Sequence, residues 1–272
     1  MRILVLGSEG QIGNYLCDYI DRNYGTAVRW DIENSPEQDL RRRSPALDHA
    51  IQSSDFVFFL AFDVGGSRYL AKYQHTYPFL ENNIRIMDTV FTSMKKYKKP
   101  FLFTSSQMSN MSYSPYGILK AVGEQYTKSL GGLVVKFWNV FGIEHDMEKA
   151  HVITDFIIKA RDTGIIDMMT DGQESRQFLY ADDACSALYE LMLRYDEPDR
   201  DQELHVTSFR YTQIINLAKY IGRRLNAEVR PSIRGDLVQL DKMNKPDPYI
   251  KKFWTPTTKV YDGVDKVIEA MV

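Results

Sequence analysis

Short, uninterrupted apolar runs alternate with amphipathic stretches along the first half of the chain. The runs are residues 2–6, 27–30, 55–62, 100–104 and 132–139. Runs of this kind are typical of strands that a parallel sheet buries on both faces. Between them, residues 79–97 and 114–130 repeat apolar positions at helical spacing, with Leu80, Ile84 and Met87 on one side of the first stretch. Because strands and helices alternate, the pattern predicts an α/β fold with a doubly wound parallel sheet.

Three glycines follow the first predicted strand at steps of three residues, as Gly7-x-x-Gly10-x-x-Gly13. A tight turn needs a residue without Cβ clashes, a pyrophosphate needs close backbone approach, and a helix packed on its strand needs no side chain between them. The helix beyond Gly13 would point its free N–H groups and positive dipole end at the phosphates. The pattern predicts a Rossmann-type dinucleotide-binding unit, with Gln11 and Ile12 as further cofactor-binding residues.

The second apolar run ends at Asp31. A carboxylate there can accept hydrogen bonds from both ribose hydroxyls of NAD, whereas it would repel the 2′-phosphate of NADP. We therefore predict that the cofactor is NAD. Further along, Asp39 and Leu40 stand where a side chain could reach the adenine.

The alternation weakens past Gly142, where polar segments interrupt it. In this half the pattern favours helices at residues 152–160, 184–195, 212–225 and 264–271, and strands at residues 176–180 and 203–207. We predict that residues 1–142 form an NAD-binding Rossmann domain to which some later segments return. Residues 143–272 would mainly form a small substrate-binding lobe.

Composition excludes several other classes of protein. A formal net charge of −2 leaves no electrostatic footprint for nucleic acid. The apolar start, residues 2–6, is too short for a signal peptide, and no apolar run reaches the roughly 18 residues of a membrane span, so a soluble cytoplasmic protein is expected. Cys17 and Cys185 are expected to be buried thiols, and the histidines lack ligand spacing, so no metal site is predicted.

Tyr116 and Lys120 stand four residues apart in a predicted helix, and therefore on one face of it. An ammonium beside a phenol favours the phenolate and would lower the pKa of Tyr116 from about 10 toward neutrality. Ser106, or Ser105, at the end of the preceding predicted strand could hydrogen-bond the same substrate oxygen. These residues would take a proton from an alcohol while a hydride leaves its carbon.

In this order the motifs resemble those of the extended short-chain dehydrogenases/reductases of the NAD-dependent epimerase/dehydratase family. The matching segments span almost the whole chain: the glycine turn, Asp31, Asp39-Leu40, Leu60-Ala61, Asn83, Thr104-Ser105-Ser106, Tyr116-x-x-x-Lys120, residues 136–142, residues 172–183, Arg234-Gly235-Asp236 and Trp254-x-Pro256. The resemblance implies that Leu60, Ala61 and Asn83 also contact NAD, and that Tyr116 and Lys120 do so besides their part in catalysis.

Members of the family mostly act on sugars carried by a nucleoside diphosphate, so the resemblance implies such a substrate. It implies that Arg176 and Arg234 hold the diphosphate, a task suited to a permanently charged guanidinium fork. It also places Asn139 near the sugar and phosphates. His151 is similar in position to an acid/base residue of GDP-sugar 3,5-epimerases and GDP-fucose synthases, although a hydrogen-bonded loop histidine is an open alternative.

The helices predicted at residues 79–97 and 114–130 resemble those that pair as a four-helix bundle between subunits of the family. A homodimer is therefore expected.

Two departures from the family pattern bear on the reaction. Gln107 and Met108 replace the Asp-Glu pair of family 4,6-dehydratases, and Met108 also stands where the 3,5-epimerases carry a proton-exchanging Cys. The segment between Ser106 and Tyr116 is shorter than is usual in the family. We predict an NAD-dependent nucleotide-sugar epimerase that acts at C4 through a transient 4-keto sugar. The alternatives are an NAD(P)H-dependent 4-keto-sugar reductase acting on a GDP- or dTDP-sugar, and a non-catalytic NAD-binding regulator.

Overall fold

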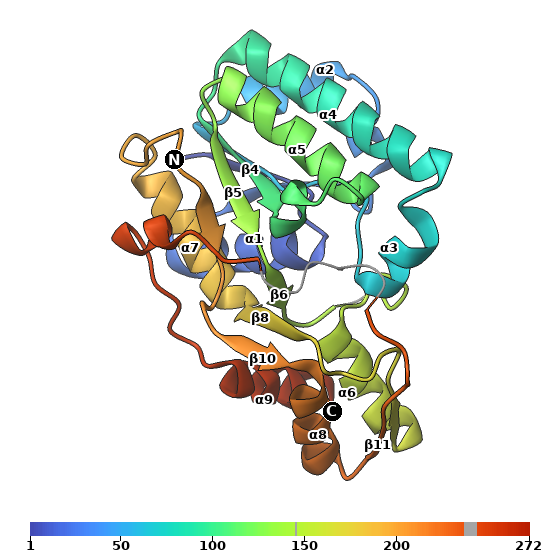
Figure 1. Ribbon diagram of the computed structural model, residues 1–272. Helices are drawn as coiled ribbons and strands as arrows, with labels where there is room; N and C mark the ends of the chain where they lie inside the picture. The colour runs from blue at the N-terminus through green and yellow to red at the C-terminus, as the bar shows by residue number, and fades with distance from the viewer. Residues whose placement is uncertain (145, 237–243) are drawn as a thin grey trace.

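A six-stranded parallel sheet forms the centre of the larger of two lobes (Figure 1). The computed structural model describes residues 1–144, 146–236 and 244–272. The strands of this sheet, in spatial order, are β2 (Ala27–Trp30), β1 (Ile3–Leu6), β3 (Phe56–Phe59), β4 (Phe101–Ser106), β5 (Leu133–Phe137) and β9 (Leu204–Val206). Every pairing in the sheet is parallel. The predicted doubly wound α/β fold is confirmed.

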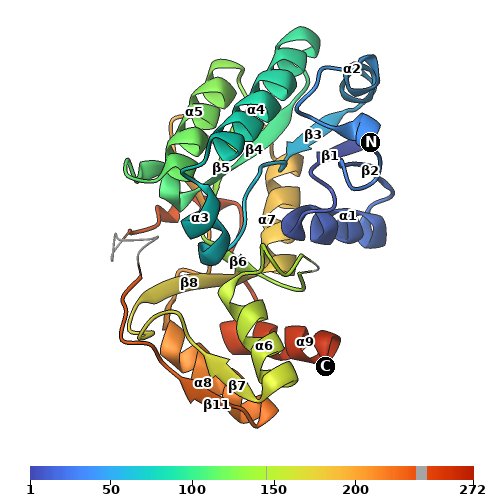
Figure 2. The same ribbon diagram turned by 90° about the vertical axis from the view of Figure 1, so that its right-hand side faces the viewer.

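Helices cover both faces of this sheet (Figure 2). On one face lie α1 (Gln11–Asn23) and α7 (Ala181–Leu193); on the other lie α2 (Pro45–Gln52), α4 (Tyr77–Tyr97) and α5 (Pro115–Ser129), with α3 (Ser67–Tyr73) below them. Successive side chains of β1 enter opposite cores, Ile3 and Val5 on the α1 side and Leu4 and Leu6 on the α4 side. This two-sided burial explains why the strand reads as an uninterrupted apolar run.

The smaller lobe is built around short strands and three helices at the bottom of Figure 1. Its elements are β6 (Asn139–Phe141), α6 (Val152–Thr163), β7 (Ile165–Asp167), β8 (Ser175–Tyr180), β10 (Tyr211–Gln213), α8 (Ile214–Leu225), β11 (Glu228–Arg230) and α9 (Val260–Met271). Strand β8 pairs in parallel with β6 and antiparallel with β10, and β11 pairs with β7. Between β8 and β10 the chain runs through α7 and β9, which belong to the larger lobe.

The strands β7, β10 and β11 and the helix α3 were not predicted from the sequence. Each of these strands has three residues, which is too short to show an alternation of apolar and polar positions. The run 132–139 also divides into β5 and β6 at Trp138, and the run 55–62 is a strand only as far as Phe59. Among the described residues, no helix is both long and apolar enough to cross a membrane.

Candidate active site

A cleft of 1730 Å³ opens at the carboxyl ends of the central strands. The chain leaves β1 for β2 and then returns to β3 on the other side of β1, and ligands of open parallel sheets bind at such a reversal. The predicted site residues that line it are Gly7, Gly10, Gln11, Ile12, Gly13, Asp31, Asp39, Leu40, Leu60, Ala61, Ser105, Ser106, Tyr116, Lys120 and His151. The fold therefore joins the glycine turn and the Tyr-Lys pair in a single cleft.

The three glycines of the turn are needed for different reasons. Gly7 has a φ of 89°, in the left-handed region, and a Cβ on it would lie 2.6 Å from the backbone nitrogen of Ala61. A Cβ on Gly13 would lie 1.9 Å from the carbonyl oxygen of Gly7. A Cβ on Gly10 would meet only that same oxygen, at an ordinary 3.5 Å. The packing of the protein thus requires Gly7 and Gly13, whereas Gly10 leaves a cradle open to the cleft.

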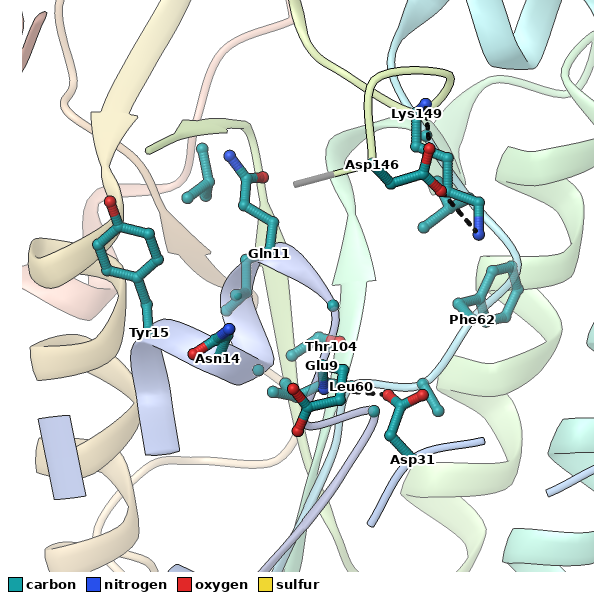
Figure 3. A pocket seen from close by; sticks show the side chains of 18 of the residues that line it. Glu9, Gln11, Asn14, Tyr15, Asp31, Leu60, Phe62, Thr104, Asp146 and Lys149 are labelled. Carbon is teal, nitrogen blue, oxygen red and sulfur yellow. Dashed lines mark hydrogen bonds and ion pairs between the residues drawn. The ribbon is translucent and has the colours of Figure 1, made fainter. Parts of the chain in front are cut away.

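The cradle has the donors that a pyrophosphate needs. Helix α1 begins after Gly10 with no side-chain cap on its N-terminal N–H groups. The Nε2 atom of Gln11, which lines the cleft (Figure 3), is buried and has no hydrogen-bond partner among the described residues. Acceptor oxygens supplied by a ligand would satisfy both the uncapped N–H groups of α1 and the Gln11 Nε2.

Asp31 lies at the other end of the turn (Figure 3). Its Oδ2 accepts a hydrogen bond from the N–H of Glu9 at 3.0 Å, and its Oδ1 accepts one from the N–H of Glu33 at 3.1 Å. These bonds fix the carboxylate while leaving it lone pairs for ribose hydroxyls. The residues present therefore fit NAD, and the acidic side chains of this segment disfavour an additional phosphate.

Tyr116 and Lys120 project from α5, and Ser106 ends β4 beside them. Burial raises the pKa of Tyr116 to about 12, opposed by a hydrogen bond with Ser106. Ser105 has a different partner, because its Oγ donates to Glu124 Oε1 at 2.5 Å. Of the two candidate serines, Ser106 is thus the one that acts on the pKa of the phenol, whereas Ser105 is bound to Glu124.

The prediction that Lys120 lowers the pKa of Tyr116 is wrong. The Nζ of Lys120 instead donates to the carbonyl oxygen of Thr104 at 2.7 Å and lies 5.9 Å from the centre of the Tyr116 ring. Burial lowers the pKa of Lys120 itself to about 7, opposed by the charge of Glu124. Desolvation outweighs the attraction between phenolate and ammonium at this depth.

His151 reaches the cleft from the loop before α6 and forms a pair with Glu144. The buried Glu144 carboxylate accepts a hydrogen bond from the backbone N–H of His151 at 2.8 Å and contacts its Nδ1 at 2.6 Å. Burial disfavours the imidazolium, but the charge of Glu144 and its hydrogen bond prevail and raise the pKa of His151.

Four predicted binding residues do not line this cleft. Asn83 is fully buried. Its Oδ1 accepts a hydrogen bond from the backbone N–H of Asp63 at 2.7 Å, and its Nδ2 donates to the Asp63 carbonyl oxygen at 3.1 Å. Its contacts make it a brace for the loop after β3. Asn139 is also outside the lining, but its buried Oδ1 has no donor among the described residues.

The predicted diphosphate ligands Arg176 and Arg234 are the other two residues outside the cleft lining. Arg176 is 6% exposed, and its guanidinium forms an ion pair of 2.6 Å with Asp236. Arg234 is exposed, and its backbone N–H donates to Ser232 Oγ.

Comparison with known proteins identifies the family. Residues 3–207 match the model of the NAD dependent epimerase/dehydratase family. The chain belongs to this family. As a member, it is an enzyme that uses NAD as cofactor, which confirms the cofactor prediction.

Relatives of this epimerase/dehydratase cover nearly its full length. A protein named putative UDP-glucose 4-epimerase from Methanocaldococcus jannaschii is 23% identical, over 99% of this chain and 98% of the relative. The solved structure of UDP-glucose 4-epimerase with UDP-glucose from Thermotoga maritima superposes with a TM-score of 0.79 at 21% identity, covering 99% and 98% of the two chains. A UDP-glucuronic acid 4-epimerase structure from Bacillus cereus gives a TM-score of 0.82 at 18% identity, with coverage of 99% and 98%. The structural likeness confirms the Rossmann-type fold.

The cleft of this epimerase/dehydratase also contains side chains that were not singled out from the sequence. They include Phe62, Trp138 and Glu144. Phe62 and Trp138 belong to apolar runs that predict strands. In the structure each residue comes after the end of its strand, and this position brings it to the cleft. Glu144 lies in a polar segment without a recognisable motif.

Proposed function

We propose that the protein is an NAD-dependent nucleotide-sugar epimerase that acts at C4 through a transient 4-keto sugar. One observation carries the proposal. Tyr116 and Ser106 line the same cleft as the glycine turn, with Lys120 one helical turn further along α5. This arrangement can exchange a proton with an alcohol at a site that also holds a dinucleotide.

The proposed mechanism assigns proton transfer to the phenol. NAD, when bound, accepts and returns a hydride and brings the positive charge of its nicotinamide ring into the cleft. Tyr116 would take the proton of the 4-hydroxyl when C4 is oxidised, and Ser106 would hydrogen-bond the same sugar oxygen. Tyr116 would give the proton back when the 4-keto sugar, turned over in the cleft, is reduced on its other face. Lys120, whose amine donates to the Thr104 carbonyl oxygen, would hold the nicotinamide ribose.

For the substrate we propose a nucleoside-diphosphate sugar, held by the smaller lobe, which residues 143–272 mainly form. The full-length relatives named UDP-glucose 4-epimerase favour UDP-hexoses as the first candidates. Asn139 contributes an oxygen that lacks a donor within the described part of the chain. The Arg176 guanidinium is paired with Asp236, so a diphosphate bound by Arg176 would have to share it with that carboxylate or displace it.

A 4-keto-sugar reductase is the second candidate. A GDP-L-fucose synthase from Sinorhizobium fredii is 27% identical over 58% of this chain and 54% of the relative. His151, paired with Glu144, also lines the cleft and gives the reductase a second titratable group in addition to Tyr116.

The test is incubation with a panel of UDP-, GDP-, dTDP- and CDP-sugars, following NADH absorbance and the sugar product by NMR. An inverted sugar with no net change in NADH supports the epimerase, and steady consumption of NADH or NADPH with a keto sugar supports the reductase. Tyr116→Phe should abolish turnover while NAD still binds. Tyr126→Phe removes the same hydroxyl from the exposed side of the same helix and should leave turnover unchanged. Full turnover by Tyr116→Phe would rule out the proposed acid/base.

We also propose a homodimer through α4 and α5. Large apolar side chains are exposed on these two helices, including Ile84 at 53%, Ile118 at 47% and Val122 at 41%. Sedimentation at micromolar concentration should show a dimer that Val122→Glu dissociates. A monomeric wild-type protein would contradict the proposal.

A further inference from the structure

The ammonium of Lys120 is buried without an ion pair. The residue is 3% exposed, and in the described ranges no carboxylate forms a salt bridge with it. Its nearest charged neighbour is Glu124 on the same helix, whose oxygens bind Ser105 at 2.5 Å and Lys136 at 3.4 Å. A buried charge needs compensation, and the carbonyl oxygen of Thr104 satisfies only one of the three N–H donors.

Aromatic rings supply the remaining contacts of this ammonium. Nζ lies 3.8 Å from the centre of the Phe62 ring, 4.9 Å from that of Phe103 and 5.9 Å from that of Tyr116. The closest ring, Phe62, also meets Tyr116 edge-on, with the centroids 5.8 Å apart and an interplanar angle of 77°. Phe62 thus contacts both proposed catalytic side chains.

Phe62 differs from Phe103 in position. Phe103 is fully buried in the core beneath α5, whereas Phe62 is partly exposed in the loop after β3 and lines the cleft (Figure 3). The next residue, Asp63, is held by the Tyr69 hydroxyl at 2.5 Å and by Asn82 at 3.0 Å. The loop that carries Phe62 is therefore anchored, and both the Phe62 ring and Lys120, which are in contact, line the cleft.

We propose that Phe62 is a positioning residue, whose ring face holds the Lys120 ammonium beside Tyr116 and whose bulk excludes water from it. The proposal rests on the proposed function for its catalytic meaning. The ring has two opposite effects on the charge of Lys120. Its π face attracts the ammonium and favours the charged form, whereas its volume removes water and favours the neutral form.

Two substitutions separate these effects. Phe62→Leu keeps most of the volume and removes the π face, so the pKa of Lys120, which burial sets at about 7, should fall further. Phe62→Ala admits water, so the same pKa should rise toward the value of an exposed lysine, about 10.4. Tyr116 and Glu124 are the titratable groups that face Lys120, and both are unchanged in the two variants.

The experiment follows the Lys120 side-chain resonance against pH in protein labelled with ε-13C lysine, assigned with Lys120→Met. The titration midpoint should move down by roughly half a pH unit or more in Phe62→Leu and up in Phe62→Ala. Phe253→Leu, which alters a partly buried ring in a different core cluster, should leave the midpoint in place. When NAD affinity is measured against pH, the midpoint of its pH dependence should also move down in Phe62→Leu and up in Phe62→Ala.

Equal midpoints in all variants, or a shift in one common direction for Leu and Ala, would overturn the proposal. The NMR titration needs no turnover, so it separates this proposal from the epimerase assignment. Opposite shifts combined with full turnover by Tyr116→Phe would uphold the role of Phe62 toward Lys120 and refute the function.

Discussion

The three glycines of the turn after β1 should respond differently to the same added methyl group. In Gly13→Ala the Cβ would lie 1.9 Å from the Gly7 carbonyl oxygen, and real Cβ atoms essentially never approach closer than 3.0 Å. The backbone of β1 or α1 must therefore move by about 1 Å, in a region that packs the sheet against its first helix. Overpacking of this severity costs about 3 kcal/mol of unfolding free energy.

Gly10→Ala should leave the fold nearly unchanged, since its Cβ meets only an oxygen at 3.5 Å. Alanine is a poorer N-cap than glycine, but it also restricts the unfolded chain, and these effects offset to within about 1 kcal/mol. The methyl group would instead occupy the space through which a pyrophosphate approaches the backbone. We expect NAD affinity to fall at least about tenfold, which corresponds to about 1.4 kcal/mol.

The assay measures two quantities for each variant. Urea unfolding followed by circular dichroism, without NAD, gives stability, and calorimetric titration of NAD into the folded protein gives affinity. Gly235→Ala, where a Cβ meets nothing within 4 Å, is the matched control and should change neither quantity. The reasoning is refuted if Gly10→Ala binds NAD as tightly as the wild type, or if it destabilises the protein as much as Gly13→Ala does.

Two further predictions concern the buried Lys136 and the half-buried Glu203 with which it pairs. Lys136 is 2% exposed and binds Glu124 at 3.4 Å and Glu203 at 2.5 Å, so Lys136→Met should cost about 3 to 5 kcal/mol in urea unfolding, and a loss below about 1 kcal/mol would contradict this. The hydrogen bond with His205, followed by the contact with Lys136, lowers the pKa of Glu203 to about 2 against the effect of burial. The stabilisation of the fold by the Glu203 carboxylate is therefore complete above about pH 4.3, the pKa of a glutamate in the unfolded chain, and is lost as the pH falls toward 2. Because Glu203 is 40% exposed, we expect only about 1 kcal/mol, and Glu203→Gln should remove this part of the acid dependence of stability.

Much of the cofactor site was predictable because its signals are local. The Gly7-x-x-Gly10-x-x-Gly13 spacing specifies a turn between adjacent elements, and the structure places those glycines between β1 and α1. Asp31 directly follows β2, which is its predicted place. The order of residues in short segments was enough to predict the positions of the glycines and Asp31, because the turn and both strands are each formed by consecutive residues.

The environment of Tyr116 and Lys120, the proposed catalytic pair, could not be predicted in this way. The spacing of Tyr116 and Lys120 indicates that they share a face of α5, but the pKa of each depends on how deeply that face is buried. Phe62 and Thr104 contact the Lys120 amine from other elements of the fold. Desolvation is a property of the packed core, and periodicity along the chain does not measure it.

The sequence by itself determined the class of fold, the glycine turn, the acid at the end of β2 and the spacing of Tyr116 and Lys120, because each depends on neighbours a few positions away. Only the tertiary structure decided that Ser105 donates to Glu124, that Arg176 pairs with Asp236, and that Phe62 lies against Lys120. Contacts of this kind join residues from separate elements, and the relative placement of those elements is set by how their apolar faces pack.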